Sequence, residues 1–569
     1  MNKRAQSRSA ARLAAVQALY QHEMEGTPVA QLIHEFHQHR IGAIIEDAEY
    51  AEADVPFFDD IVKGALARAE EVDAAITARL AMLLAATALV GGGVAEAQLK
   101  AIRTATSISP AERKQGDEAH PQLLAEFGGA YAGPQAAYVN RIGQNIAVQS
   151  GLSHSPSDFT VTLLNSPVNN AFAIPGGYVY VTRQLMALMN DEAELAGVLG
   201  HEVGHVAAQH SKKRQSAATR NTILGVLASV LGGAIGDNGG LLGGLGGLLQ
   251  NNAMQVAQLA TLGFSRSQEL EADQLGVQYL KRAGYDPMAL STMLASLANQ
   301  TNLEARLSGG DARSLPEWAS THPDPASRVR NAQTLASRVG TGGVRNADAF
   351  LASVDGVLYG DDPAQGVVEG RDFLHPDLRL RFTVPNGFAM QNGTSAVSIS
   401  GNGGQAQFST AAYNGDMTAY IADVFKSVAG DAKITPGPIQ RTTVNGIPAY
   451  FSSARANSQS GQVDVTVFAY EFAPKSAFHF VTLAKAGGSG VFNPMFGSVR
   501  RLTASEAAAI RPRRVDVVTV KSGDSVAALA KRMAYSNYQS ERFQVLNRLS
   551  ATSRLAPGQK VKLVVYANR

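Results

Sequence analysis

The segment His201-Glu202-Val203-Gly204-His205 constrains the fold of this 569-residue chain more than any other. Two histidines four positions apart lie on one face of an α-helix, so both imidazoles can bind one metal ion while Glu202 lies beside it. The flanking sequence favours such a helix, because Asn190 or Asp191 can cap its start and apolar residues recur at helical spacing up to Val206. The motif therefore predicts a metal-binding helix.

A third ligand must come from elsewhere in the chain, since catalytic zinc sites use three protein ligands and keep one position open. There is no cysteine, so histidines and carboxylates are the candidates. In a helical stretch downstream, Glu269 shares its face with small residues and with Asp273, whereas Glu271 shares its face with long polar side chains. We predict one zinc ion per chain, bound by His201, His205 and Glu269, with Asp273 orienting a ligand histidine.

His210 lies nine residues after His201, about half a turn out of phase on a continuous helix, so we do not expect it to bind this ion.

Length and composition predict several folded domains. At roughly 100 to 200 residues per domain, the chain has room for about three to five. Hydrophobic residues make up 45% and charged residues 17%, which is typical of globular proteins. The net charge of +2 excludes a whole-chain field that would attract nucleic acid or anionic lipid.

The predicted fold class is multidomain α+β. Residues 99–340 show the pattern of a mainly helical domain that contains the metal motif. Residues 350–505 alternate apolar and polar residues between Asn-Gly turns, which predicts an antiparallel α+β domain that serves as a binding or spacer module. A basic, proline-containing linker then leads to a small domain at 515–566.

Four motifs resemble those of metallopeptidase family 48, the zinc endopeptidases that include HtpX, the CAAX prenyl proteases and periplasmic BepA. The match covers about residues 110–335 and rests on residues 170–177, 201–205, 265–273 and 320–328. The resemblance implies a gluzincin-type peptidase domain that acts on polypeptides. It also implies that an extended substrate adds as a strand along the edge formed by Asn170, Ala171 and Phe172.

The same resemblance implies a mechanism in which zinc activates water, while Glu202 accepts the water's proton and passes it to the leaving amine. His322 is a further candidate. It either stabilises the transition state, or occupies the open zinc position and keeps the enzyme latent, or merely caps a turn. Arg328 either pairs with a carboxylate near the site or lies on the surface.

Residues 1–79 resemble the front half of NusB, an all-helical RNA-binding family. The resemblance rests on residues 9–21, 54–58 and 62–64 and on the basic residues Lys3, Arg4, Arg8 and Arg12. It implies RNA as a partner. A vestigial or artificially joined leader is the alternative.

Residues 80–98 contain an apolar stretch and an A-x-A site, which together are typical of a signal peptide. An Ala-rich core helix is the alternative. If this segment is processed, the protein is periplasmic or in the cell envelope, and otherwise it is cytoplasmic. We expect no transmembrane span, because no apolar run reaches the roughly 20 residues needed. The glycine-rich stretch at 221–265 is interpreted as an apolar flap or a glycine-packed hairpin.

The C-terminal segment resembles a LysM domain, a small βααβ fold, through residues 519–525, 529–530, 543–547 and 555–561. LysM domains bind N-acetylglucosamine glycans such as peptidoglycan, and a cap without glycan affinity is the alternative.

The whole sequence predicts a zinc metalloendopeptidase that hydrolyses misfolded or misassembled envelope proteins. The alternatives are a non-catalytic periplasmic chaperone, a peptidoglycan-binding protein, or an RNA-binding protein.

Overall fold

The computed structural model describes residues 104–211, 264–307, 325–429, 434–458, 461–550 and 552–567, together with Ile102, His322 and short stretches of the first 67 residues. The chain divides into two compact units, Met1–Ala101 and Ile102–Arg569. Several sequence predictions lie outside the described residues: the signal-like segment 80–98, most of the glycine-rich stretch, and the basic residues Lys3, Arg4, Arg8 and Arg12.

The first unit contains helices α2 (Val29–His39) and α3 (Val55–Ala67) and the short strands β1 (Ile44–Ile45) and β2 (Ala48–Glu49). The two helices contact each other through Phe36 and Phe58, whose ring centroids lie 5.6 Å apart. Both rings are buried in an apolar cluster with residues such as Leu32 and Val62. The fragment therefore has a small core of its own.

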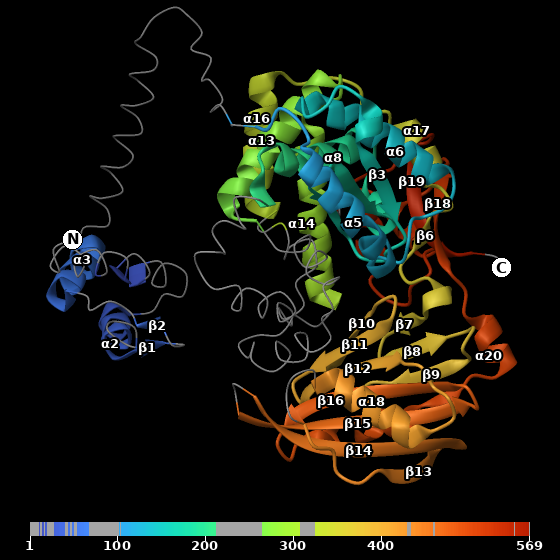
Figure 1. Ribbon diagram of the computed structural model, residues 1–569. Helices are drawn as coiled ribbons and strands as arrows, with labels where there is room; N and C mark the ends of the chain where they lie inside the picture. Colours follow the sequence, from blue (N-terminus) through green and yellow to red (C-terminus); the bar gives the residue numbers. More distant parts are fainter. Residues whose placement is uncertain are drawn as a thin grey trace, which may run out of the picture. The chain divides into compact units, whose positions relative to one another are not determined.

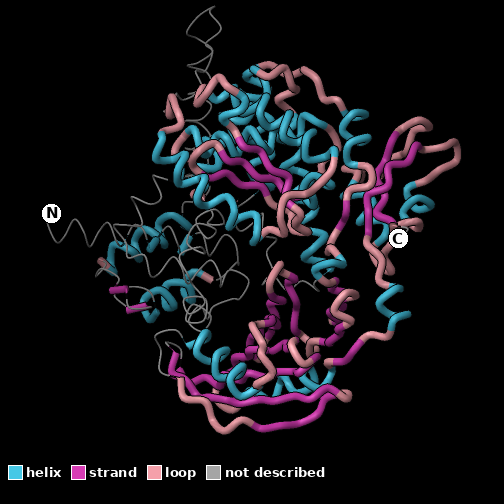
Figure 2. The backbone as a smooth tube through the Cα atoms, turned by 45° about the vertical axis from the view of Figure 1, so that its right-hand side comes forward, coloured by secondary structure: helices cyan, strands magenta, loops and turns pink. Residues whose placement is uncertain are grey.

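The second unit begins with a three-stranded sheet covered by helices (Figures 1 and 2). The helices are α5 (Pro110–Glu126) and α6 (Pro134–Ala147), and the strands are β3 (Thr160–Leu164), β4 (Ala171–Ile174) and β5 (Tyr178–Thr182). The order is β3-β5-β4, with β3 parallel and β4 antiparallel to β5. Alternation along the strands turns Tyr178 and Tyr180 toward α5, and Val161 toward Gly143 of α6. In the described part of the chain, no strand pairs with the second edge of β4.

Among the described residues of this region, six more helices follow: α7 (Arg183–Leu188), α8 (Glu192–Ala207), α13 (Arg266–Arg282), α14 (Ala289–Leu307), α16 (Pro325–Val339) and α17 (Ala347–Val354). Asp191 caps α8 by accepting a hydrogen bond from the amide of Glu194 at 3.0 Å. Helices α8 and α13 cross closely because glycines face each other: a Cβ atom on Gly276 would lie 3.1 Å from the amide nitrogen of His201. Within the described residues, no helix has both the length and the apolar character needed to cross a membrane.

The next region is built on a seven-stranded antiparallel sheet with the order β10-β11-β12-β16-β15-β14-β13. Its strands are β10 (Phe388–Asn392), β11 (Ala396–Gly401), β12 (Gly404–Thr410), β13 (Gln440–Val444), β14 (Ile447–Ser458), β15 (Gly461–Ala473) and β16 (Ser476–Lys485). The Asn-Gly pairs that start at residues 392 and 445 both connect antiparallel neighbours, and Asn445 and Gly446 have the positive φ angles of 49° and 77° that such turns require. The antiparallel sheet predicted from sequence is confirmed.

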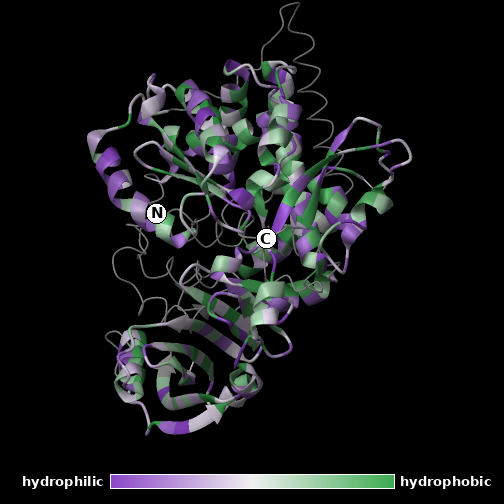
Figure 3. Ribbon diagram, turned by 90° about the vertical axis from the view of Figure 1, so that its right-hand side faces the viewer, coloured by the Kyte–Doolittle hydropathy of each residue, from purple (hydrophilic) through white to green (hydrophobic). Residues whose placement is uncertain are grey.

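Both faces of this sheet are covered. Helix α18 (Met417–Ala429) packs its apolar side on one face. The other face packs against a four-stranded sheet with the order β17-β9-β8-β7 and against α19 (Asn493–Ser498). These strands are β7 (Val367–Glu369), β8 (Asp372–His375), β9 (Leu380–Thr383) and β17 (Arg500–Arg501). Figure 3 shows hydrophobic and hydrophilic bands alternating along the strands of this region.

After α20 (Ala504–Ala509), the chain ends in the element order β18 (Arg513–Thr519), α21 (Val526–Ala530), α22 (Gln539–Leu546) and β19 (Lys560–Tyr566). Strands β18 and β19 form an antiparallel pair, and β6 (Leu358–Tyr359), which follows α17 in the chain, pairs with the other edge of β18. Phe543, Leu546 and Leu563 are among the residues of its apolar core.

Candidate metal centre

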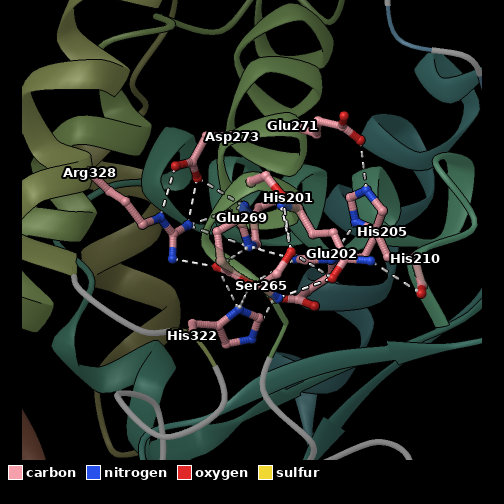
Figure 4. A network of polar contacts seen from close by, with 12 residues as sticks. His201, Glu202, His205, His210, Ser265, Glu269, Glu271, Asp273, His322 and Arg328 are labelled. Atoms are coloured by element: carbon pink, nitrogen blue, oxygen red, sulfur yellow. Dashed lines mark hydrogen bonds and ion pairs between the residues drawn. The ribbon is translucent and has the colours of Figure 1, made fainter. Parts of the chain in front are cut away.

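Helix α8 presents two imidazoles toward one point in the protein interior. The Nε2 atoms of His201 and His205 lie 3.0 Å apart, and both side chains are buried. This arrangement follows from their spacing of four residues on a helix that is buried along nearly its whole length. The predicted helix is therefore present, and its two histidines converge (Figure 4).

Helix α13 supplies a carboxylate at the same point. The oxygens of Glu269 lie 3.5 Å from Nε2 of His201 and 3.4 Å from Nε2 of His205. His322 approaches as well, with its Nδ1 atom 3.1 Å from Glu269. One ligand atom from each of these four buried residues lies within 4.8 Å of all the others. Such a group of imidazole and carboxylate donors fits a zinc ion.

Glu202 lies beside this group and is almost fully buried. Its Oε1 atom has no hydrogen-bond partner among the described residues, and the nitrogen Nε2 of His322 lies 3.5 Å away. Burial raises the pKa of Glu202 above its ordinary value. A raised pKa suits a carboxylate that has to accept a proton and then release it.

Asp273 and Arg328 support the first histidine. Oδ1 of Asp273 lies 3.0 Å from Nδ1 of His201, and Arg328 donates to both oxygens of Asp273, at 2.8 and 2.6 Å. Arg328 also donates to Glu269 at 2.5 Å. Of the two alternatives left open for Arg328, the structure has the pairing with carboxylates near the site.

The pKa values in this group reflect the charges around it. Burial works against a charged His201, but its contacts with Asp273 and Glu269 prevail and raise its pKa to about 9. Burial also opposes ionisation of Asp273, yet the neighbouring Arg328 holds the pKa of this carboxyl below its ordinary value. Burial lowers the pKa of His205 well below the ordinary value, and the proximity of His201 adds to this effect.

The charge of the site supports the presence of a divalent cation. Three carboxylates, Glu202, Glu269 and Asp273, are fully or almost fully buried, and Arg328 is the buried guanidinium that pairs with two of them. An imidazole that binds a metal ion is neutral, so with neutral imidazoles and an ionised Glu202 these four groups carry a net charge of −2. Because isolated buried charge is costly, an ion of charge +2 fits this environment.

His210 lies near the site in a position that the helical pattern does not predict. His210 Nδ1 lies 2.9 Å from Nδ1 of His205, and His210 Nε2 lies 3.1 Å from Glu271. The helix ends at Ala207, and Gln209 adopts a positive φ of 54°, so the phase of a continuous helix no longer applies at His210. His210 thus contacts a candidate ligand instead of pointing away, although it is not in the four-residue group.

The predicted substrate strand lies at the start of β4. The amide of Asn170 donates to Thr182 at 3.2 Å, and Ala171 pairs with Val181 of β5. The ring of Phe172 stacks on Tyr180 with the centroids 4.7 Å apart, inside the core. Contact with a substrate along this strand would therefore use backbone groups and not the Phe172 ring.

Three family models match the chain: peptidase family M48 over residues 134–336, the NusB family over residues 9–85 and the LysM domain over residues 518–564. The three resemblances predicted from the sequence motifs are therefore confirmed. The M48 match contains α8, α13 and all residues of the candidate metal centre.

Individual relatives match separate parts of the chain. The transcription antitermination protein NusB of Sphingopyxis alaskensis is 94% identical over 81 residues, which cover 14% of this chain and 54% of that protein. The beta-barrel assembly-enhancing protease of Escherichia coli O157:H7 is 31% identical over 216 residues, 37% of this chain and 41% of that protein. The mitochondrial metalloendopeptidase OMA1 of Schizosaccharomyces pombe is 28% identical over 222 residues, 38% of this chain and 59% of that protein. The chain thus spans about half the length of the curated relatives it matches.

Proposed function

We propose that this protein is a zinc metalloendopeptidase of the gluzincin type, with His201, His205 and Glu269 as the ligands of one zinc ion per chain. The observation that carries the proposal is the buried convergence of these donors, with Glu202 beside them and a net charge that matches a dication. The M48 match over the same residues supports it.

The chemistry of peptide hydrolysis divides between the ion and the chain. Zinc, when bound, supplies Lewis acidity that polarises the scissile carbonyl and lowers the pKa of water. Glu202 accepts a proton from the attacking water and delivers it to the leaving amine. Asp273 holds Nδ1 of His201, which leaves Nε2 free to act as a ligand atom, and Arg328 keeps Asp273 ionised.

His322 is proposed to occupy the position that an active site must keep open. Its ring nitrogens lie 3.1 Å from Glu269 and 3.5 Å from Glu202, inside the group of donor atoms, and the side chain is 2% exposed. In this position it favours a latent state, and a polypeptide substrate must displace it. If His322 occupied this position permanently, no substrate could reach the metal ion, and the protein would be the non-catalytic chaperone named above as an alternative.

The proposed substrates are polypeptides that add as a strand to the second edge of β4, at Asn170, Ala171 and Phe172. Misfolded or misassembled envelope proteins are the proposed clients, and the periplasm or cell envelope is the proposed location. The names of the bacterial relatives, beta-barrel assembly-enhancing proteases, support both parts of this proposal.

The C-terminal LysM-like domain, residues 515–566, is proposed to bind peptidoglycan. A pocket of about 300 Å³ lies beside α21 and the start of α22, lined by residues such as Lys531, Asn537 and Tyr538. Tyr538 is 43% exposed and can contact a sugar ring. Phe543 is fully buried, and the Tyr535 ring has the guanidinium groups of Arg513 and Arg542 at 5.1 and 4.1 Å from its centroid, so both rings are already engaged within the protein.

The NusB-like segment, residues 1–79, keeps RNA binding as a second candidate function, because its sequence is 94% identical to part of a transcription antitermination protein. A gel shift with structured RNA tests this function separately. Binding that persists after removal of the segment would exclude it.

Hydrolysis of casein or of a quenched fluorescent peptide tests the enzymatic proposal. Glu202→Gln removes the proton acceptor and should lower kcat/KM by about 10² to 10⁴ while zinc remains bound. Glu118→Gln on the exposed face of α5 is the matched control and should leave the rate unchanged. Equal activity in the Glu202→Gln variant would exclude this site as the source of hydrolysis.

A further inference from the structure

The C-terminal domain of the second unit contacts the start of the metal-binding helix. Helix α22 lies against α14 and α7, and two basic residues reach the turn between α7 and α8. They are Arg548, which follows α22, and Lys562 in β19. The C-terminal domain is therefore docked on the peptidase region within one folded unit. A separate glycan-binding domain on a flexible linker would not make such a contact.

Lys562 is fully buried in this contact. Its Nζ atom donates to the backbone oxygen of Ala187 at 2.8 Å and to that of Met189, the residues at which α7 ends. The last carbonyls of a helix lack partners within the helix and carry partial negative charge, so an ammonium group is favoured there. Lys562 thereby fixes the turn that leads into α8.

Arg548 forms an ion pair with Glu194 in the first turn of α8. Glu194 is fully buried and also accepts from the hydroxyl of Thr292 at 2.6 Å and from the amide of Asn190 at 2.8 Å. Arg548 has a φ of 52°, which is unfavourable for a residue with a Cβ atom. The backbone thus adopts an uncommon conformation at the residue that makes this contact.

The basic residues of the C-terminal domain dock beside a cluster of carboxylates. Around the start of α8, the peptidase region contributes three carboxylates, Asp191, Glu194 and Asp286, which share Arg345 as a partner. Glu192 next to them has its own partners, the hydroxyls of Tyr138 and Tyr285 and the more distant Arg141. Arg548 adds a positive charge, and Lys562 adds a second when it is protonated, although burial lowers the pKa of Lys562 to about 7.

The contact lies on the same face of α8 as the metal-binding histidines. Glu194 precedes His201 by seven residues and His205 by eleven, so each lies within about 20° of it on a helix with 3.6 residues per turn. A regular helix moves as one body, so a rotation of α8 about its axis at the first turn also moves both imidazoles. Side-chain tips lie about 5 to 6 Å from the axis, and a rotation of about 10° displaces them by about 1 Å.

We propose that Arg548 and Lys562 are positioning residues of the metal centre, which fix the rotation of α8 by docking the C-terminal domain on the turn between α7 and α8. The proposal rests on the proposed peptidase function for its effect on rate. It makes the C-terminal domain a required part of the catalytic unit.

The test uses the full-length chain with Arg548→Gln, Arg548→Lys and Lys562→Met, and with Lys521→Met as the control. Lys521 is exposed on the same domain, and its hydrogen bond to Asp524 is donated by the backbone amide, which the substitution keeps. Arg548→Gln is the main variant, because its side chain is 35% exposed and its loss leaves no large hole. Steady-state kinetics on a quenched peptide and hydrogen exchange of the α8 amides are measured for each.

We expect Arg548→Gln to lower kcat about tenfold or more, since misplacement by about 1 Å can reduce a rate by about 10². KM should stay within about twofold, because the polar contacts of Arg548 and Lys562 are made with the start of α8 and the end of α7 and not with the substrate strand β4. Arg548→Lys should restore at least half of the loss, which a merely structural defect would not predict. Amides in the first turns of α8 should exchange faster in Arg548→Gln and Lys562→Met but not in Lys521→Met.

An unchanged kcat in a folded Arg548→Gln variant, or a loss that lysine does not restore, would overturn the proposal. If the wild-type chain hydrolyses no peptide, the proposed function fails instead, and hydrogen exchange decides the docking alone. Faster exchange at the start of α8 then supports the positioning role, and identical exchange in all four variants contradicts it.

Discussion

Replacing Asp273 by asparagine should weaken metal binding without removing any metal ligand. Asp273 is fully buried, lies 3.0 Å from Nδ1 of His201 and accepts two hydrogen bonds from Arg328. Asparagine keeps the shape of the side chain but removes one of the three carboxylate charges of the site, so the site becomes less negative and its net charge changes from −2 to −1. Its amide can also present a donor to His201, which would disfavour the orientation in which Nε2 is the ligand atom.

The expected magnitude follows from comparable partners of ligand histidines. Loss of such a partner typically costs about 10- to 100-fold in metal affinity, or about 1.4 to 2.7 kcal/mol. Competition with a chromogenic zinc chelator measures the affinity, and circular dichroism checks that the variant is folded. Glu118→Gln makes the same chemical change at an exposed carboxylate, 3.9 Å from Lys114, and should bind zinc like the wild type. A folded Asp273→Asn variant with affinity within about threefold of the control would refute the reasoning.

Two further predictions concern stability. Gly276→Ala should destabilise the protein by about 1 to 3 kcal/mol, measured by urea unfolding, because the added methyl group would lie 3.1 Å from the amide nitrogen of His201. Gly497→Ala is the control and should leave the stability unchanged, because a methyl group at Gly497 would have open space around it. Burial lowers the pKa of His479 to about 4 from the ordinary 6.5, so the unfolded chain binds a proton that the folded chain does not, and stability is lost as the pH falls through 6.5 toward 4. At pH 5 this loss should be about 2 kcal/mol relative to pH 7.5, and His479→Gln should remove most of it; an equal pH dependence in the variant would contradict the assignment.

The sequence predicted the parts of the site that depend on regular helices. The spacing of His201 and His205, and the small residues that share a face with Glu269, both follow from the helical repeat, and α8 and α13 are regular over these positions. The same repeat puts His210 out of phase only if the helix continues beyond Ala207, where α8 ends. The spacing of apolar residues does not indicate that the helix ends there or that Gln209 adopts a positive φ.

The contact of the C-terminal domain with α8 could not be predicted from the sequence. Lys562 lies in a strand where lysine normally faces solvent, and its burial depends on carbonyl groups of residues 187 and 189, far away in the chain. Likewise, the pairing of β6 with β18 joins segments about 150 residues apart. Periodicity reports which face of an element is apolar, but it does not report which distant surface covers that face.

The most direct test of the account is the zinc content and the zinc environment of the purified full-length protein. Elemental analysis together with anomalous diffraction at the zinc edge should show one ion per chain, bound by His201, His205 and Glu269 on α8 and α13. The absence of a stoichiometric metal ion after purification without chelators and incubation with zinc would contradict the account. An ion bound elsewhere, with Glu269 remote from it, would contradict it equally.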